Sequence, residues 1–279
     1  MDIFKKCFDF EDARQAKAAG VYPYFLPLDR NEGTEIVYEG RRIIMCGSNN
    51  YLGLTAHPRI REAAIDAIKK YGTSCTGSRF LNGNMTIIED LERDLADWVG
   101  KDSALIFSTG MQVNLGTISA LVGRGDIVIL DKEDHASIYD GARLSHGKIE
   151  RFRHNDVEHL ERVLKSLPDS GGRLLVVDGL FSMEGDIAPL PEMIPLCQQY
   201  GVRLMVDDAH AMGVLGGGRG TAAHFGINEG VDLIMSTFSK SFASIGGFVA
   251  GQADVIDYIK HVARSLIFSA SIPPANVAT

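Results

Sequence analysis

Residues 236–247, which read STFSKSFASIGG, hold a single lysine, Lys240, in a loop crowded with hydroxyl groups. An apolar run at 231–235 precedes this loop and another at 248–250 follows it, and both are typical of buried strands. Burial disfavours the ammonium form, so the pKa of such a lysine falls and its amine becomes a nucleophile suited to bonding a carbonyl carbon. A lysine that reaches solvent from a surface loop is the alternative, and this stretch alone leaves both open.

The composition is that of a soluble globular protein. With 279 residues, 45% hydrophobic and 23% charged, the chain is long enough for one large domain or two smaller ones. Its net charge of −8, with dispersed lysines and arginines, argues against a nucleic-acid partner. No apolar run approaches the roughly 20 residues of a transmembrane helix, and the N-terminus has no signal-peptide core. Four scattered cysteines indicate neither a zinc site nor disulfides. We therefore expect a cytoplasmic protein.

The chain is predicted to begin with an N-terminal arm at 1–45, followed by one large domain at 46–279. The arm opens with a helical stretch, and two prolines within 22–27 prevent a regular element there. A small β-hairpin is predicted at 36–45, with its turn at Glu39-Gly40.

A β-α alternation fills most of the large domain. Short apolar runs predict strands, and segments with apolar residues at helical spacing predict the helices between them. Such alternation predicts an α/β fold with a mostly parallel central sheet and helices on both faces. The strands are predicted at 104–107, 127–130, 174–177, 203–206 and 233–235, and the helices between them at 112–121, 157–167 and 191–200.

Polar residues follow the predicted strands, at the sheet edge where open α/β sheets bind their ligands. Ser108, Thr109 and Gly110 come after the first strand, where a helix begins. The free N–H groups of a helix start suit a phosphate, although serine and threonine are also common N-caps. His135 follows the next strand and could stack on a planar ring or act as an acid–base group. A hydrogen-bonded structural histidine is the alternative.

Asp207 and His210 follow the strand at 203–206. A carboxylate at the end of a buried strand is costly unless a cation or proton donor meets it, and a protonated pyridine nitrogen is such a donor. A metal pair is the alternative, but no third ligand is evident. A helix start for phosphate, a ring-facing histidine, a carboxylate and a buried lysine together form the set that pyridoxal 5'-phosphate (PLP) requires.

These residues resemble the α-oxoamine synthases, a family of fold-type I PLP enzymes. The resemblance extends from about Tyr51 to Thr279 and rests on four motifs: NYLGL at 50–54, DGLFSMEGD at 178–186, DDAH at 207–210 and TFSK at 237–240. Within the family, five further stretches are most similar to the serine palmitoyltransferases: GSRFLNG at 77–83, FSTG at 107–110, HASIYDG at 135–141, RFRHN at 151–155 and FSASIPP at 268–274.

The resemblance implies a role for each matching residue. Lys240 would bind PLP covalently and move a proton at Cα of the amino acid. His135 would stack on the cofactor ring, and Asp207 would pair with its nitrogen. The other implied positions are near the ring hydroxyl or substrate (His210 and Ser182), at the phosphate (Gly110, Met111 and Thr237), at the partner subunit's phosphate (Ser269) and near the thioester (Asn50).

The implied activity is the decarboxylative condensation of an amino acid with an acyl-CoA by a homodimer with a shared site. L-serine with a long-chain acyl-CoA is favoured, and glycine with acetyl-CoA or alanine with a pimeloyl thioester are the alternatives. A non-catalytic subunit is a further alternative, and the presence of Lys240, His135 and Asp207 argues against it. A PLP-free α/β binding protein is another, which a visible absorption spectrum would exclude. Two departures stand out: Met111 replaces a common aromatic, and the chain stops at Thr279, where relatives continue into a small domain. We expect that C-terminal small domain to be absent from this chain.

Overall fold

The computed structural model describes residues 2–279, which separate into two compact units that divide between Gly47 and Ser48. The first unit contains two short helices and a three-stranded antiparallel sheet, in which the predicted hairpin is confirmed. The division lies near the predicted end of the arm, and the role of the two units as separate domains stays a prediction. The elements of the first unit are α1 (Lys5–Phe8), α2 (Asp12–Ala18), β1 (Arg30–Glu32), β2 (Glu35–Tyr38) and β3 (Arg41–Ile44).

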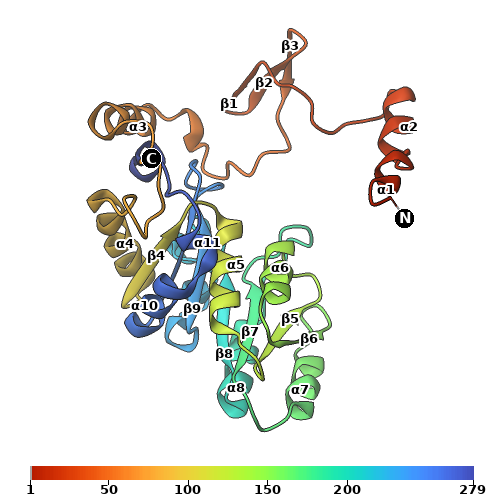
Figure 1. The fold of residues 1–279 in the computed structure, drawn as a ribbon, viewed down its shortest axis with the longest axis vertical. Helices are drawn as coiled ribbons and strands as arrows, with labels where there is room; N and C mark the ends of the chain where they lie inside the picture. Colours follow the sequence, from red (N-terminus) through yellow and green to blue (C-terminus); the bar gives the residue numbers. More distant parts are fainter. Residues whose placement is uncertain (1) are drawn as a thin grey trace. The chain divides into compact units, whose positions relative to one another are not determined.

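A seven-stranded sheet organises the second unit (Figure 1), in the order β4-β10-β9-β8-β7-β5-β6. Strands β9, β8, β7, β5 and β6 pair in parallel with one another, which confirms the predicted mostly parallel sheet. Strand β10 pairs antiparallel with both of its neighbours, β9 and the edge strand β4. The strands are β4 (Ser103–Phe107), β5 (Ile127–Asp131), β6 (Lys148–Phe152), β7 (Arg173–Asp178), β8 (Arg203–Asp207), β9 (Leu233–Thr237) and β10 (Gly247–Gly251).

The reversal of β10 follows from how it is connected to β9. A parallel neighbour needs a crossover of a dozen or more residues, usually a helix, whereas an antiparallel neighbour is reached by a short loop. The loop at 238–246 carries Lys240 and contains no helix, so the chain returns antiparallel. Gly246 ends this loop at φ +111°, a backbone conformation that favours glycine.

Helices cover both faces of the sheet, as the alternation predicted. Side chains at alternate positions of each strand enter two separate cores, as Val176 and Val177 of β7 show. One core packs against α4 (Thr86–Val99), α7 (Val157–Ser166), α8 (Leu190–Tyr200) and α9 (Thr221–Phe225). The other packs against α5 (Gly110–Leu121), α6 (Ala136–Leu144), α10 (Ala253–Val262) and α11 (Arg264–Ile267).

The remaining elements lie in the connections and at the end of the chain: η1 (Leu54–Ala56), α3 (Pro58–Tyr71), η2 (Gly216–Gly218), η3 (Asn228–Gly230) and α12 (Pro274–Ala278). The boundaries of the predicted strands and helices agree closely with those in the structure, except that α5 begins at Gly110 rather than at 112. Within residues 2–279, no helix has both the length and the apolar character that a membrane span needs.

Candidate active site

A cavity of about 330 Å³ opens at the carboxyl ends of β7, β8 and β9 and beside the start of α5. Its volume falls in the range of roughly 300–1,000 Å³ that is typical of ligand pockets. Seven of the residues predicted from the sequence line it together: Gly110, Met111, His135, Asp207, His210, Thr237 and Lys240. The topology therefore gathers at one edge residues that are up to 130 positions apart, from Gly110 to Lys240.

The amine of Lys240 is directed at His210, with 2.7 Å between Lys240 Nζ and His210 Nε2. Burial lowers the pKa of Lys240, while the nearby carboxylates of Asp207 and Asp178 act in the opposite direction. The lowered pKa increases the share of unprotonated amine at neutral pH, which is the nucleophilic form.

His210 is held between Lys240 and a tyrosine that the sequence analysis did not assign to the site. Tyr51 Oη lies 2.6 Å from His210 Nδ1. Burial, followed by the positive charges of Lys240 and His135, lowers the pKa of His210 to about 4. The imidazole is therefore neutral near pH 7, and its two nitrogens join Tyr51 to Lys240.

Asp207 ends β8 as a buried carboxylate whose two oxygens each accept a hydrogen bond. Its Oδ1 accepts from the backbone N of Ala209 at 2.9 Å, and its Oδ2 accepts from Asn114 Nδ2 at 2.7 Å. Asp178 is its register partner on β7. Burial and then the charge of Asp207 raise the pKa of Asp178 well above its usual range, which favours the neutral form of Asp178.

The start of α5 and the end of β9 approach each other closely at one end of the cavity. A Cβ at Gly110 would lie 2.7 Å from Thr237 Oγ1, so only glycine fits there. Thr109 is the N-cap, and its hydroxyl accepts from the backbone N of Gln112 at 3.1 Å. Thr237 Oγ1 lies 2.8 Å from Ser239 Oγ. Free N–H groups at a helix start beside two hydroxyls suit a phosphate.

Three predicted residues do not line this cavity, and their roles stay predictions. Ser182 is exposed on the turn after β7. Ser269 accepts a hydrogen bond at 2.8 Å from Nε2 of Gln112, which lies in the first turn of α5. Asn50 donates from Nδ2 to Thr55 Oγ1 at 2.9 Å. Conversely, Asn114, Ser137 and Asp178 line the cavity although the sequence analysis gave them no role there.

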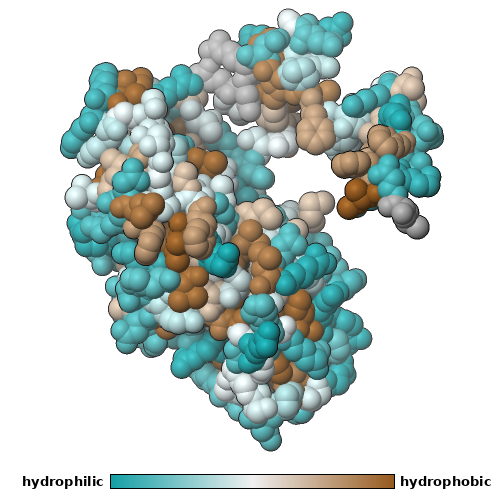
Figure 2. Space-filling model, in the orientation of Figure 1, coloured by the Kyte–Doolittle hydropathy of each residue, from teal (hydrophilic) through white to brown (hydrophobic). Residues whose placement is uncertain are grey.

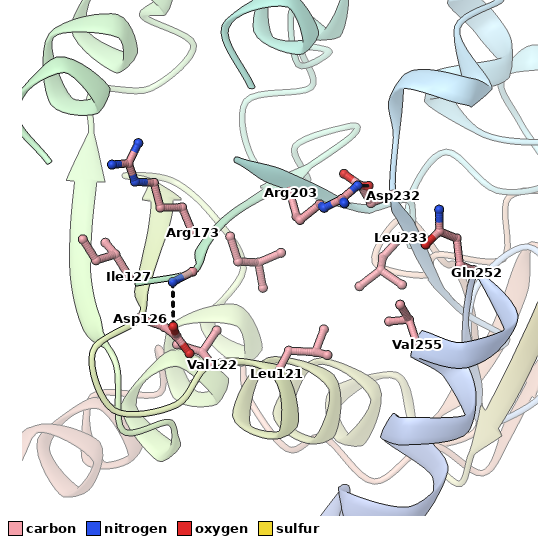
Figure 3. Close-up of a pocket in the computed structure, with 12 residues that line it drawn as sticks. Leu121, Val122, Asp126, Ile127, Arg173, Arg203, Asp232, Leu233, Gln252 and Val255 are labelled. Atoms are coloured by element: carbon pink, nitrogen blue, oxygen red, sulfur yellow. Dashed lines mark hydrogen bonds and ion pairs between the residues drawn. The ribbon is translucent and has the colours of Figure 1, made fainter. Parts of the chain in front are cut away.

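A second cavity, of about 250 Å³, lies at the opposite ends of the strands (Figure 3). Its wall is mostly apolar, with Leu121 and Leu233 among its members, and its charged groups are already paired. Arg203 Nη1 lies 2.7 Å from Asp232 Oδ1, and Asp126 Oδ1 accepts from the backbone N of Gly172 at 2.7 Å. It offers no nucleophile, so we place the chemistry in the first cavity.

Asp208, next to Asp207, is expected to make stability fall as pH rises. It is fully buried, and burial raises its pKa to about 7. The folded state holds this proton more tightly than the unfolded chain, whose carboxyl has a pKa of about 3.9. The stability that protonated Asp208 contributes to the folded state is therefore fully present below a pH of about 3.9. It is lost as pH rises through about 7. One pKa unit corresponds to about 1.4 kcal/mol, so the whole effect is on the order of 4 kcal/mol.

Urea unfolding of wild type and of Asp208→Asn between pH 4 and 8 tests this expectation. The variant should lack the part of the pH dependence that Asp208 causes, and the exposed control Asp169→Asn should retain it. Parallel curves for the wild type and Asp208→Asn would show that Asp208 titrates normally.

The residues around the first cavity fit PLP. An amine can bond the cofactor's aldehyde carbon, a buried carboxylate can meet a protonated ring nitrogen, and a helix start can bind a phosphate. Lys240, Asp207 and Gly110 supply these three groups at one cavity. Together with the sheet described above, they define a fold-type I PLP-dependent transferase.

Comparison with known proteins narrows this class. The family of class I and II aminotransferases matches residues 41–279. The serine palmitoyltransferase of Sphingobacterium spiritivorum is 56% identical over 97% of this chain and 68% of that protein. The 8-amino-7-oxononanoate synthase of Thermoanaerobacter pseudethanolicus is 44% identical over 96% of this chain and 68% of that protein.

Solved structures agree with the sequence relatives. The serine palmitoyltransferase of S. paucimobilis with a bound PLP–myriocin aldimine superposes with a TM-score of 0.96 at 39% identity, over 100% of this chain and 71% of that one. The enzyme of Sphingomonas wittichii gives a TM-score of 0.93 at 40% identity, with the same coverage. The chain belongs to the α-oxoamine synthase family of PLP-dependent acyltransferases, and it spans about two thirds of the length of its curated relatives.

Proposed function

We propose that the protein condenses L-serine with a long-chain acyl-CoA, releasing CO₂ and CoA. The observation that carries the proposal is the single cavity shared by Lys240, Asp207 and the start of α5. The choice of serine is supported by the 56% identity to a serine palmitoyltransferase, compared with 44% to an 8-amino-7-oxononanoate synthase. Condensation of alanine with a pimeloyl thioester is the second candidate, which the latter similarity supports.

Bound PLP supplies an electron-withdrawing pyridine ring that stabilises negative charge at Cα of the amino acid. Lys240 takes the Cα proton, because its amine has a lowered pKa and lies in the cavity. Asp207 keeps the ring nitrogen protonated through its buried charge, and the neutral His210 orients the amine of Lys240. The new bond joins Cα to the acyl carbon as the C–S bond breaks and CoA leaves as the thiolate. The bond from Cα to the carboxylate then breaks, CO₂ leaves, and Lys240 returns the proton to Cα.

We propose that the active form is a homodimer with a shared site. Figure 2 shows hydrophobic residues gathered on the face where α5 and α11 lie in Figure 1. Phe268 is 75% exposed directly after α11, next to the predicted partner-contacting Ser269. Such exposed apolar area is typical of an interface.

The absorption spectrum of the PLP-loaded protein distinguishes the candidate amino acids. We expect a visible band that shifts when L-serine is added and changes little with glycine or L-alanine at equal concentration. A selective shift with L-alanine would support the second candidate instead. Absence of any PLP-dependent band would contradict the whole proposal.

A further inference from the structure

A buried asparagine connects the two residues expected to meet the cofactor ring from different sides. Asn114 lies on α5 one turn after Gly110 and has no solvent exposure. Its Nδ2 donates to Asp207 Oδ2 at 2.7 Å and to Ser137 Oγ at 2.8 Å. An amide nitrogen carries two hydrogens, so it can make both bonds at once. The opposite amide orientation would place Oδ1 against the Asp207 carboxylate, where two acceptors repel each other.

The bond from Asn114 determines what Ser137 can do. An amide nitrogen only donates, so Ser137 Oγ is the acceptor and its own hydrogen remains free. His135 Nδ1 lies 2.7 Å from that hydroxyl and also receives the backbone N–H of Ser137 at 3.3 Å. The backbone N–H can only donate, so it requires Nδ1 of His135 to be an acceptor, and the free hydrogen of the Ser137 hydroxyl is then the donor in the shorter contact. The neutral imidazole must then carry its hydrogen on Nε2.

We propose that Asn114 and Ser137 form a positioning relay that fixes His135 as the Nε2–H tautomer and orients the carboxylate of Asp207. Neither residue touches the reacting atoms in this proposal; both act through His135 and Asp207. Because Asp207 Oδ1 is held by the backbone of Ala209, the donor from Asn114 fixes the second oxygen and so the carboxylate plane. The relay thus couples His135, which is proposed to stack on the cofactor ring, to Asp207, which is proposed to pair with the ring nitrogen. Its cofactor role rests on the proposed function.

The tautomer is measured directly by nitrogen-15 NMR of histidine-labelled protein without PLP, above the ordinary histidine pKa of about 6.5. The His135 signals are assigned by their loss in His135→Asn. We expect Nδ1 to be unprotonated and Nε2 protonated in wild type. Ser137→Ala should produce a mixture of tautomers, and Ser137→Thr, which keeps the hydroxyl, should restore the single form. The matched control is Ser241→Ala, since Ser241 is equally buried and its hydroxyl has no partner within residues 2–279.

A wild-type His135 protonated at Nδ1, or an unchanged tautomer in Ser137→Ala, would overturn the relay. The second measurement is PLP affinity by fluorescence. Asn114→Ala should weaken PLP binding on the order of tenfold, as expected for losing a hydrogen bond to a charged group, and Ser241→Ala should not. Unchanged affinity in a folded Asn114→Ala protein would contradict the coupling to Asp207. Since the NMR result needs no PLP, failure of the relay and failure of the proposed function give separate results.

Discussion

Lys240→Ala is expected to lower turnover on the order of 10⁴-fold, because it removes both the covalent linkage to PLP and the base that takes the Cα proton. Lys240 is the only lysine among the described residues that line the cavity, so no other amine can replace it. The visible band that borohydride fixes to the wild-type protein should also be lost. Turnover is measured as CoA release with L-serine and an acyl-CoA.

Two control variants make this result specific. Lys165→Ala removes an exposed lysine from α7, whose partner is Glu161, and should leave turnover unchanged. Lys240→Arg retains a positive charge but cannot form the covalent linkage, so it should be as inactive as the alanine variant. Activity of Lys240→Ala within tenfold of wild type would show that the base lies elsewhere.

Asp207→Asn is expected to lower turnover by roughly 10²-fold, the magnitude typical of losing one preorganised electrostatic group. The side chain keeps its size but loses the charge that would hold a proton on the ring nitrogen. Asp207→Glu retains the charge at a shifted position and should recover part of the activity. The measurement is turnover at saturating L-serine, together with PLP affinity.

The same substitution at Asp178 provides a comparison for Asp207→Asn. The raised pKa of Asp178 already favours its neutral form, so Asp178→Asn should cost much less than Asp207→Asn. Equal losses in the two variants would contradict the assignment of the negative charge to Asp207.

The sequence predicted the sheet well because its central strands are buried on both faces and therefore appear as continuous apolar runs. β6 was missed because it is an edge strand in which Lys148, Glu150 and Arg151 interrupt that pattern. The direction of β10 was not predicted either, because apolar content reports burial and not direction. The direction of β10 depends on the short loop around Lys240. The length of that loop becomes informative only once β9 and β10 are known to be neighbours in the sheet.

The site was predictable where a residue directly follows a strand, because the carboxyl ends of parallel strands meet at one edge. Asp207 was found in this way, whereas the role of Thr237 was implied by the resemblance to the α-oxoamine synthases. Tyr51 could not be, because its contact with His210 joins positions 159 apart and depends on the course of a loop. Asn114 left a weaker signal, namely an amide in the middle of a mostly apolar helix, whose other amide, Gln112, lies in the first turn. Ser137 looked like an ordinary residue in the first turn of a helix.

The most direct test of the proposed function is mass spectrometry of the product that the PLP-loaded protein forms from palmitoyl-CoA and an equimolar mixture of L-serine, glycine and L-alanine. We predict that the α-oxoamine derived from L-serine predominates and that CO₂ and CoA are released in equal amounts with it. A predominant product from glycine or L-alanine, or acyl transfer without release of CO₂, would contradict the proposed function.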